Sequence, residues 1–111
     1  MSKLYYLRWG QRDHDYEAEA SELFHEFHVD PPESIPESEF DRLYEEIGEV
    51  EVDDLEQLYA EWNRGSGQES REFLEQEVRS LSVGDVVERD GEYYACAPIG
   101  WQELLLEGDP E

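Results

Sequence analysis

"RSLSVGDVVERDGEYYACAPIGW", residues 79–101, is the stretch that decides the fold. Asp90 and Gly91 lie between two short runs of strand-forming residues, and an Asp-Gly pair in this setting is a strong signal for a tight hairpin turn. A two-residue turn places Val87 opposite Tyr94, which gives an apolar contact across the two strands. The stretch therefore predicts a β-hairpin.

The segment just before the hairpin has the composition of a turn. We expect the hydroxyls of Ser80 and Ser82 to bond nearby backbone groups, as serines in turns commonly do. Gly84 and Asp85 then start the first strand of the hairpin. If the hairpin binds another molecule, we expect the contact at its exposed strand edges, because an open edge can pair with an added strand.

The rest of the chain predicts one early strand and several short amphipathic helices. Residues 3–9 (KLYYLRW) are rich in strand-forming types. Beyond them, apolar residues recur at helical spacing in four segments, residues 15–28, 38–48, 53–63 and 71–78.

The boundaries of these helices follow from prolines and capping residues. The prolines of DPPESIP, residues 30–36, stop the first helix because proline cannot donate a helical hydrogen bond. Ser38 and Asp53 are the expected N-caps of the second and third helices. Residues 49–53 favour an extended linker over an edge strand, and residues 100–106 fit either a last strand or a helical turn.

Together these elements predict an α+β fold. We expect a small antiparallel sheet, made of the N-terminal strand and the C-terminal β-hairpin, packed against three or four short amphipathic helices. A length of 111 residues suits a single domain. That domain, residues 1–111, would consist of a strand at 1–10, a helical region at 15–65 and the hairpin segment at 79–101.

The charge of the chain is extreme. It has 31 acidic residues against 8 Lys and Arg, for a formal net charge of −23, and the acids interleave with the apolar residues. Such a protein repels itself unless salt screens the charge, so the composition is typical of salt-adapted organisms. Direct binding to nucleic acid is not expected, because phosphate contacts need clustered basic residues. An acidic mimic of DNA that blocks a DNA-binding enzyme is the alternative interpretation.

We expect no catalytic residue, no metal and no cofactor. His25 and His28 share one face of the first helix, with Glu22 and His14 nearby, and are weak candidate metal ligands, but a second ligand pair is missing. Cys96 is the one cysteine, so no intrachain disulfide can form, and its position between alanines predicts a buried small residue rather than a nucleophile. No apolar run approaches a membrane span or a signal core, which favours a cytoplasmic protein.

The aromatic residues near the hairpin allow two interpretations. Tyr93, Tyr94 and Trp101 could form a stacking platform for bases, but no basic residues accompany them. Packing roles are favoured, and any exposed ring would instead indicate a protein–protein surface.

The end of one predicted helix, the loop after it and the hairpin segment together form a recognisable motif. One helix ends in Leu58, Tyr59, Trp62 and Asn63, and a Gly-Ser loop follows it. This pattern, with the early Tyr-rich strand, resembles the YodL-like family, most strongly over residues 55–101. The residues that occupy the positions of the family signature are Arg79, Ser80, Leu81, Ser82, Val83, Gly84, Asp85, Tyr93, Tyr94, Gly100 and Trp101. Gly84 replaces the family's usual serine, and Trp101 its usual phenylalanine.

The resemblance implies an accessory role rather than a reaction. The family occurs on plasmids, integrative elements and phages, its activity is unassigned, and anti-restriction roles have been suspected. With the acidic composition, this implies a non-catalytic interaction protein of a haloarchaeal plasmid, provirus or virus that contacts an unknown protein partner. An acidic DNA mimic or anti-restriction protein is the alternative, and a metal-dependent enzyme ranks last. Contact with nucleic acid or membrane is not expected.

Overall fold

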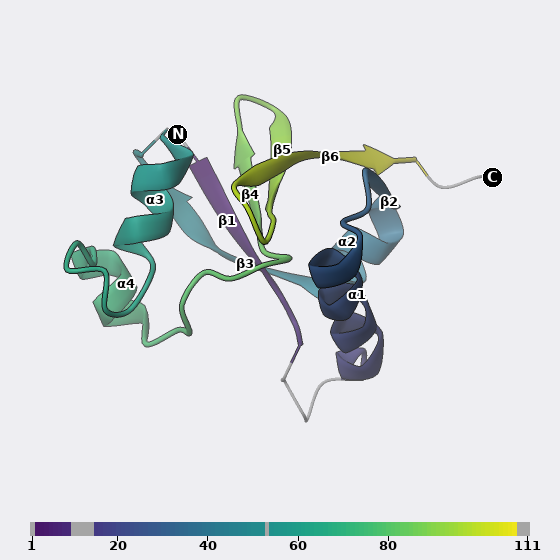
Figure 1. The fold of residues 1–111 in the computed structure, drawn as a ribbon, viewed down its shortest axis with the longest axis horizontal. Coiled ribbons are helices and arrows are strands. Elements are labelled where there is room, and N and C mark those ends of the chain that lie inside the picture. Colours follow the sequence, from purple (N-terminus) through teal and green to yellow (C-terminus); the bar gives the residue numbers. More distant parts are fainter. Residues whose placement is uncertain (1, 10–14, 53, 109–111) are drawn as a thin grey trace.

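A six-stranded sheet in the order β2-β6-β5-β4-β1-β3 forms the centre of the protein. The computed structural model describes residues 2–9, 15–52 and 54–108, and within these ranges it confirms the α+β class (Figure 1). In chain order the elements are β1 (Ser2–Leu7), α1 (Glu17–Val29), β2 (Ser34–Pro36), α2 (Glu37–Leu43), β3 (Tyr44–Val50), α3 (Leu55–Glu61), α4 (Arg71–Gln76), β4 (Val86–Arg89), β5 (Glu92–Cys96) and β6 (Trp101–Glu107).

The predicted hairpin is confirmed, and so is its pairing with the N-terminal strand. Asp90 and Gly91 have φ values of 52° and 82°, as a tight hairpin turn with left-handed central residues requires. Val87 lies opposite Tyr94, and β4 also pairs with β1. However, β5 pairs with β6, so both hairpin strands are internal. The expectation of a binding edge on the hairpin is therefore wrong, because those backbone groups are already bonded within the sheet.

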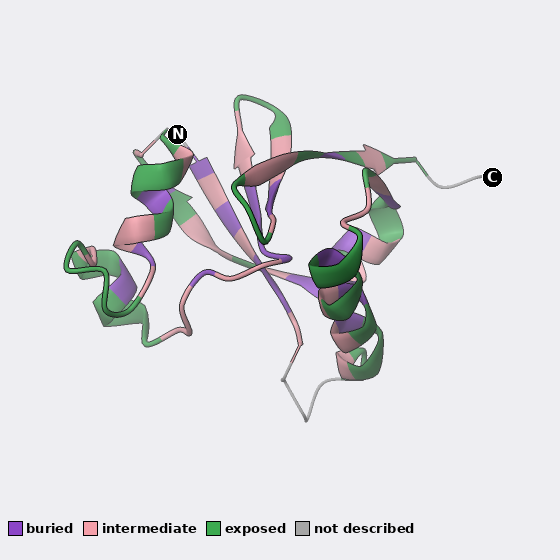
Figure 2. Ribbon diagram, viewed as in Figure 1, coloured by how far each residue is buried: buried purple, intermediate pink, exposed green. Residues whose placement is uncertain are grey.

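Helices cover both faces of the sheet. Helices α1 and α2 lie on one side of β1 and helices α3 and α4 on the other (Figure 1). Because side chains alternate along a strand, β1 contributes to two cores. The core under α1 and α2 contains Leu7, Ala20, Leu23, Phe27, Ile35, Phe40, Leu43, Tyr44, Val86, Ala95 and Leu104. The core under α3 and α4 contains Leu4, Tyr6, Val50, Leu58, Trp62, Phe73, Leu81 and Val87. Buried positions, purple in Figure 2, occur on the strands and on the helices of both sides.

The prediction of one helix over residues 38–48 is wrong in its second half. Helix α2 ends at Leu43, and β3 follows directly and pairs with β1 as an edge strand. The register of this pair shifts between Leu4 and Tyr5, so that β3 bulges. Because of the bulge, side chains of β3 do not alternate strictly between the two faces of the sheet. Its apolar residues at positions 44, 47 and 50 are therefore three apart, a spacing that is also typical of a helix.

The sheet is larger than expected, and one of its pairings is parallel. Residues 34–36, predicted only to stop the first helix, form β2 and pair in parallel with β6. Residues 101–107 form a strand rather than a helical turn. Residues 49–50 belong to β3 rather than to a linker. The expected helical region 15–65 is consequently interrupted by β2 and β3.

The helix caps also differ from the expected ones. Ser38 lies inside α2, whose N-cap is Pro36. Asp54 caps α3 by accepting hydrogen bonds from the backbone of Glu56 and Gln57, whereas Asp53 lies outside the described residues. The side chain of Pro36 forms no capping hydrogen bond, so only in α3 does a neighbouring residue take the role that the sequence pattern assigned.

A glycine at position 84 is required where the signature segment meets both β1 and α1. Gly84 has a φ of 92°, and an added Cβ would lie 3.2 Å from Leu7 Cδ2 and 3.3 Å from Phe27 Cδ2. A side chain here would be strained by the backbone and crowded by the core. The structure thus gives a physical reason for a glycine at position 84.

We expect Gly84→Ala to lower the free energy of unfolding by about 1–2 kcal/mol through left-handed strain and by roughly 1–3 kcal/mol more through overpacking. Urea unfolding at molar salt, followed by circular dichroism, measures this loss. Gly65→Ala is the matched control, because Gly65 has a φ of 86° with no atom within 4 Å of the added Cβ. Equal losses in both variants would show that crowding at position 84 has no effect.

Candidate functional site

An ion pair between the partly exposed Arg79 and the buried Asp85 organises the signature segment. Arg79 donates from Nη1 to Asp85 Oδ2 (2.6 Å) and from Nη2 to Asp85 Oδ1 (2.8 Å). The Asp85 side chain is fully buried. It also accepts hydrogen bonds from the backbone N–H groups of Leu7 and Ser82, each at 2.8 Å. Four donors thus surround this carboxyl group.

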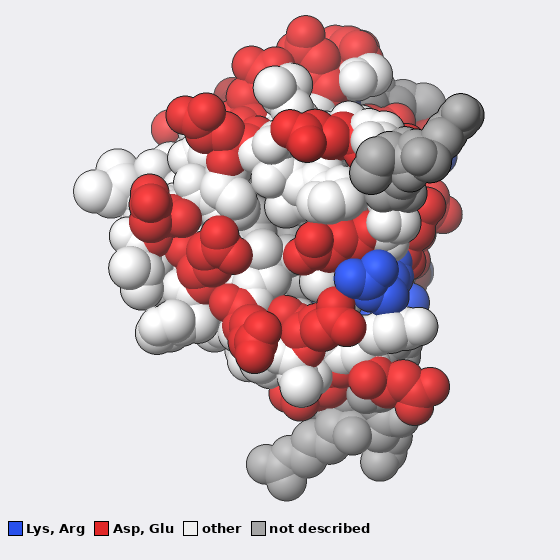
Figure 3. Space-filling view, turned by 90° about the vertical axis from the view of Figure 1, so that its right-hand side faces the viewer, with Lys and Arg blue, Asp and Glu red and all other residues white. Residues whose placement is uncertain are grey.

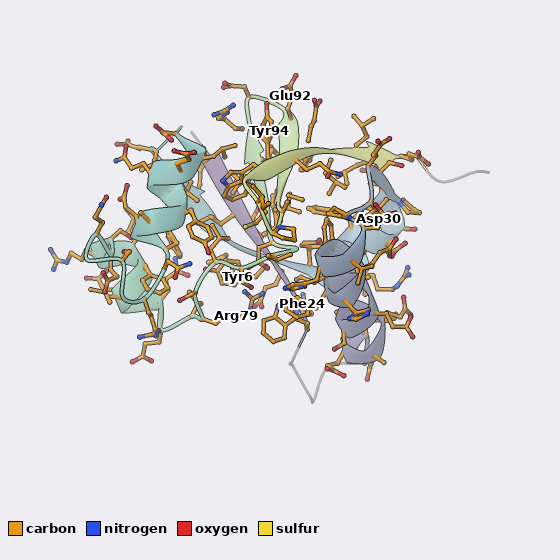
Figure 4. All side chains as sticks on the ribbon, viewed as in Figure 1. Tyr6, Phe24, Asp30, Arg79, Glu92 and Tyr94 are labelled. Atoms are coloured by element: carbon orange, nitrogen blue, oxygen red, sulfur yellow. The ribbon has the colours of Figure 1, made fainter. Side chains whose placement is uncertain are left out.

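The same arginine joins the signature segment to the end of β1. Its Nη2 donates to the backbone oxygen of Leu7 (2.8 Å). Its guanidinium carbon lies 4.4 Å from the ring centre of Tyr6 and 5.0 Å from that of Trp9. Trp9 in turn stacks on Phe24 of α1, with ring centroids 4.2 Å apart. Arg79 and Phe24 therefore belong to one continuous set of contacts between the loop, β1 and α1 (Figure 4).

The hydrogen bonds of Arg79 and Asp85 hold parts of the chain together. Burial raises the pKa of the Asp85 carboxyl, while the hydrogen bonds from Arg79 and from the backbone oppose that shift. The carboxyl already accepts bonds at both oxygens, and the guanidinium is held between its partners. The geometry leaves neither group directed at a substrate.

The other signature residues also have packing and bonding roles. Ser80 Oγ accepts a hydrogen bond from the backbone N–H of Arg64 (2.9 Å), so the hydroxyl does bond the backbone, but to a residue 16 positions away and not within the turn. Ser82 Oγ instead accepts from the Arg79 side chain (3.1 Å), so the expectation of a hydroxyl–backbone bond is wrong there. Leu81 is buried under α3 and α4.

The three aromatic residues near the hairpin do not form one platform. Tyr93 packs against the ring of Phe40, with centroids 5.5 Å apart, on the α1–α2 face. Tyr94 lies on the opposite face, where the Arg89 guanidinium stands 4.9 Å from its ring centre and its hydroxyl donates to Glu92 (2.7 Å). Because neighbouring residues on a strand point to opposite faces, the pair cannot stack successive bases on one surface.

The structure places the weak metal candidates on the outside of α1. His25 and His28 are both exposed, and His28 Nδ1 lies 2.8 Å from the backbone oxygen of Phe24. His14 lies outside the described residues. Within the described ranges, no three His, Cys, Asp or Glu side chains gather in a way that could hold a metal ion.

An apolar groove lies between α3 and the turn that joins β5 to β6. Its volume is about 280 Å³, and its lining residues are Glu56, Tyr59, Val83, Cys96, Ala97, Pro98, Gly100 and Trp101. The rings of Tyr59 and Trp101 meet edge to face, with centroids 6.5 Å apart and planes at 85°. A second hollow, of about 500 Å³, has a lining that includes four glutamates and is correspondingly less apolar, namely Glu49, Glu51, Glu61 and Glu72.

The tip of the β5–β6 turn carries the most exposed large apolar side chain among the described residues. Ile99 is 94% exposed. The turn is closed by a hydrogen bond from the Ala97 N–H to the Gly100 oxygen (3.0 Å), and Gly100 has a φ of 71°. We call Tyr59, Pro98, Ile99 and Trp101 the turn surface. Sequence reasoning listed Trp101 and Gly100 as signature residues but missed Ile99. The signal available was an apolar Pro-Ile pair in a turn, where polar residues are usual.

Cys96 lines this groove, but its thiol has low reactivity. It is buried, as its position between alanines predicted. Burial raises the pKa of its thiol to about 12, and the nearby Asp85 carboxylate adds to the shift. At neutral pH the group is therefore a thiol, which is a poor nucleophile.

Acidic side chains cover the protein on many elements. Each of the four helices in the described ranges carries at least one glutamate, and so do β3, β4, β5 and β6. On the face shown in Figure 3 the carboxylates are scattered, with uncharged side chains between them. The charge is therefore spread over the surface rather than gathered on one element.

Comparisons of the chain with protein-family models, curated proteins and solved structures find no match. Among the described residues, no helix has the length and apolar character needed to span a membrane.

We expect Arg79→Met to lower the free energy of unfolding by about 3–5 kcal/mol, because it leaves Asp85 buried without its counter-charge. Urea unfolding at molar salt measures the loss. Arg71→Met is the control, since Arg71 forms an exposed ion pair with Glu75 on α4, and such pairs contribute about 0–1 kcal/mol. A loss for Arg79→Met no larger than the control's would show that the ion pair does not organise the segment.

We expect thiol reagents to label Cys96 slowly in the folded protein at about pH 8 and rapidly in urea. The raised pKa means that folding favours the protonated thiol. Its contribution to stability is complete below the unfolded pKa of about 8.5 and is lost as the pH rises toward the folded value. Labelling rates measured across this pH range test the expectation. Fast labelling of the folded protein at about pH 8 would contradict it.

Proposed function

We propose that the protein is a non-catalytic interaction protein that binds a partner protein through the turn surface, in the cytoplasm of a salt-adapted host. The observation that carries this proposal is Ile99, 94% exposed at the tip of a hydrogen-bonded turn and next to an apolar groove. A large apolar side chain held in water by a fixed turn is the kind of anchor that protein interfaces bury.

The composition of the turn surface supports the same proposal. Tyr and Trp are enriched in the centres of protein interfaces, where charged residues are depleted. Tyr59 and Trp101 are both partly exposed here, and Glu56 is the one charged residue in the groove lining. In a chain of which 35% is charged, such a patch stands out from the rest of the surface.

The spread of carboxylates favours salt adaptation over DNA mimicry. A mimic would need acids in rows on one elongated face, at the spacing of phosphates. Glutamates on all the helices described, and on strands β3 to β6, fit a surface adapted to high salt better. The anti-restriction alternative therefore has less support than protein–protein contact.

The proposed origin in a haloarchaeal plasmid, provirus or virus rests on the resemblance to the YodL-like family and on the acidic composition. The packing roles of Arg79, Ser80 and Asp85 support an accessory rather than a catalytic role for a protein with this signature. In this proposal the signature residues stabilise the fold.

We expect Ile99→Asp to abolish partner capture, because a carboxylate at this position cannot be buried in an apolar interface. Tagged wild-type protein is incubated with haloarchaeal lysate at molar potassium chloride, and retained proteins are identified by mass spectrometry. Leu74→Asp is the matched control, since Leu74 is 54% exposed on α4, away from the turn surface. Equal retention of the same partner by wild type and Ile99→Asp would overturn the proposal.

A further inference from the structure

We infer that the groove beside Tyr59 and Trp101 takes a proline-rich segment of the partner that also carries Arg or Lys. This inference rests on the proposed function and names the partner's chemistry. Four observations lead to it: the aromatic lining, the size of the groove, its charge and the way its walls are held.

The lining suits proline rings. Tyr59 and Trp101 present two rings at 85° to each other, and Val83, Ala97 and Pro98 complete an apolar wall. Extended proline-rich segments dock into aromatic-lined grooves and lose little entropy, because their backbone is preformed. Aromatic rings supply the flat apolar area that a proline ring can cover.

The size of the groove favours a small occupant over a larger one. A volume of about 280 Å³ lies just under the usual range for small-molecule pockets, roughly 300–1,000 Å³. An amphipathic helix needs several anchors spread over two turns, which calls for a larger groove than one of about 280 Å³. One or two proline rings of an extended chain fit a groove of this size.

The charge selects a basic segment. Glu56 is the one charged residue among the described residues that line the groove, and the chain as a whole carries a net charge of −23. A cation next to the prolines would pair directly with Glu56, a contact short enough to persist at high salt, where charge effects at longer range are screened. An acidic side chain at the same place would meet Glu56 with like charge, which disfavours an acidic ligand.

The groove is preformed because its walls are braced against each other. The backbone N–H of Leu81 donates to the Trp62 oxygen (2.8 Å), and Asn63 Nδ2 donates to the Leu81 oxygen (3.1 Å), which fixes the end of α3 to the signature loop. The Gly84 N–H donates to the Cys96 oxygen (2.9 Å), which fixes that loop to β5. Preorganisation of this kind reduces the cost of binding a stiff ligand.

Three short synthetic peptides test the inference by titration into isotope-labelled protein, followed by NMR. One is proline-rich with flanking arginines, the second replaces its prolines with alanine, and the third replaces its arginines with glutamate. We expect saturable shifts at the Trp101 indole and at Tyr59 with the first peptide, and about tenfold weaker binding with each of the others. Equal binding of the first and second peptides would overturn the inference, since charge alone would then explain it.

Matched variants locate the contact. We expect Tyr59→Ala to weaken the first peptide about tenfold. We expect Glu56→Gln to weaken the first peptide but leave unchanged the binding of a proline-rich peptide without charges. Leu74→Ala is the control that should change nothing, and circular dichroism checks that each variant is folded. Unchanged affinity in Tyr59→Ala would overturn the inference.

The two proposals fail in different ways. If the first peptide does not bind although Ile99→Asp still abolishes partner capture, the proline-rich partner is wrong and the interaction surface remains. If Ile99→Asp also leaves capture unchanged, both proposals are wrong.

Discussion

The rest of the structure depends on one buried ion pair, between Arg79 and Asp85. A carboxylate removed from water is costly unless charge and hydrogen bonds replace the lost solvent. Here the replacement comes from three places in the chain: the Arg79 guanidinium, the Ser82 backbone and the backbone of Leu7 at the end of β1. Satisfying one carboxyl group therefore fixes where the first strand ends relative to the segment that starts the hairpin.

This arrangement fits a protein with a net charge of −23. Surface carboxylates repel one another and depend on salt for screening, whereas a buried pair is screened much less. Arg79 also contacts Tyr6 and Trp9 through its flat face, so the pair is packed as well as bonded. A change in salt concentration therefore alters the repulsion between the exposed carboxylates more than it alters the ion pair of Arg79 and Asp85.

The proposed interaction surface is a consequence of the same brace. The signature loop, closed by the ion pair between Arg79 and Asp85 on either side of it, supplies Val83 to the groove and bonds to the end of α3 through Leu81. The β5–β6 turn supplies the opposite wall. The signature loop thus holds the two walls of the groove at a fixed distance from each other.

The sequence by itself determined the elements whose signals are local. Asp90-Gly91 specified the hairpin and its register, apolar spacing specified α1, and the alanines beside Cys96 indicated its burial. Strand β3 could not be predicted, because a bulge gives its apolar residues a helical spacing, and β2 owes its existence to pairing with β6, which lies about 70 residues further along the chain. The same limit applies to the candidate site: the sequence singled out Trp101, but its contact with Tyr59 and the exposure of Ile99 depend on where α3 meets the β5–β6 turn. Only the tertiary structure decided these features, because the hydrogen bonds and packing that create them join residues that no local pattern connects.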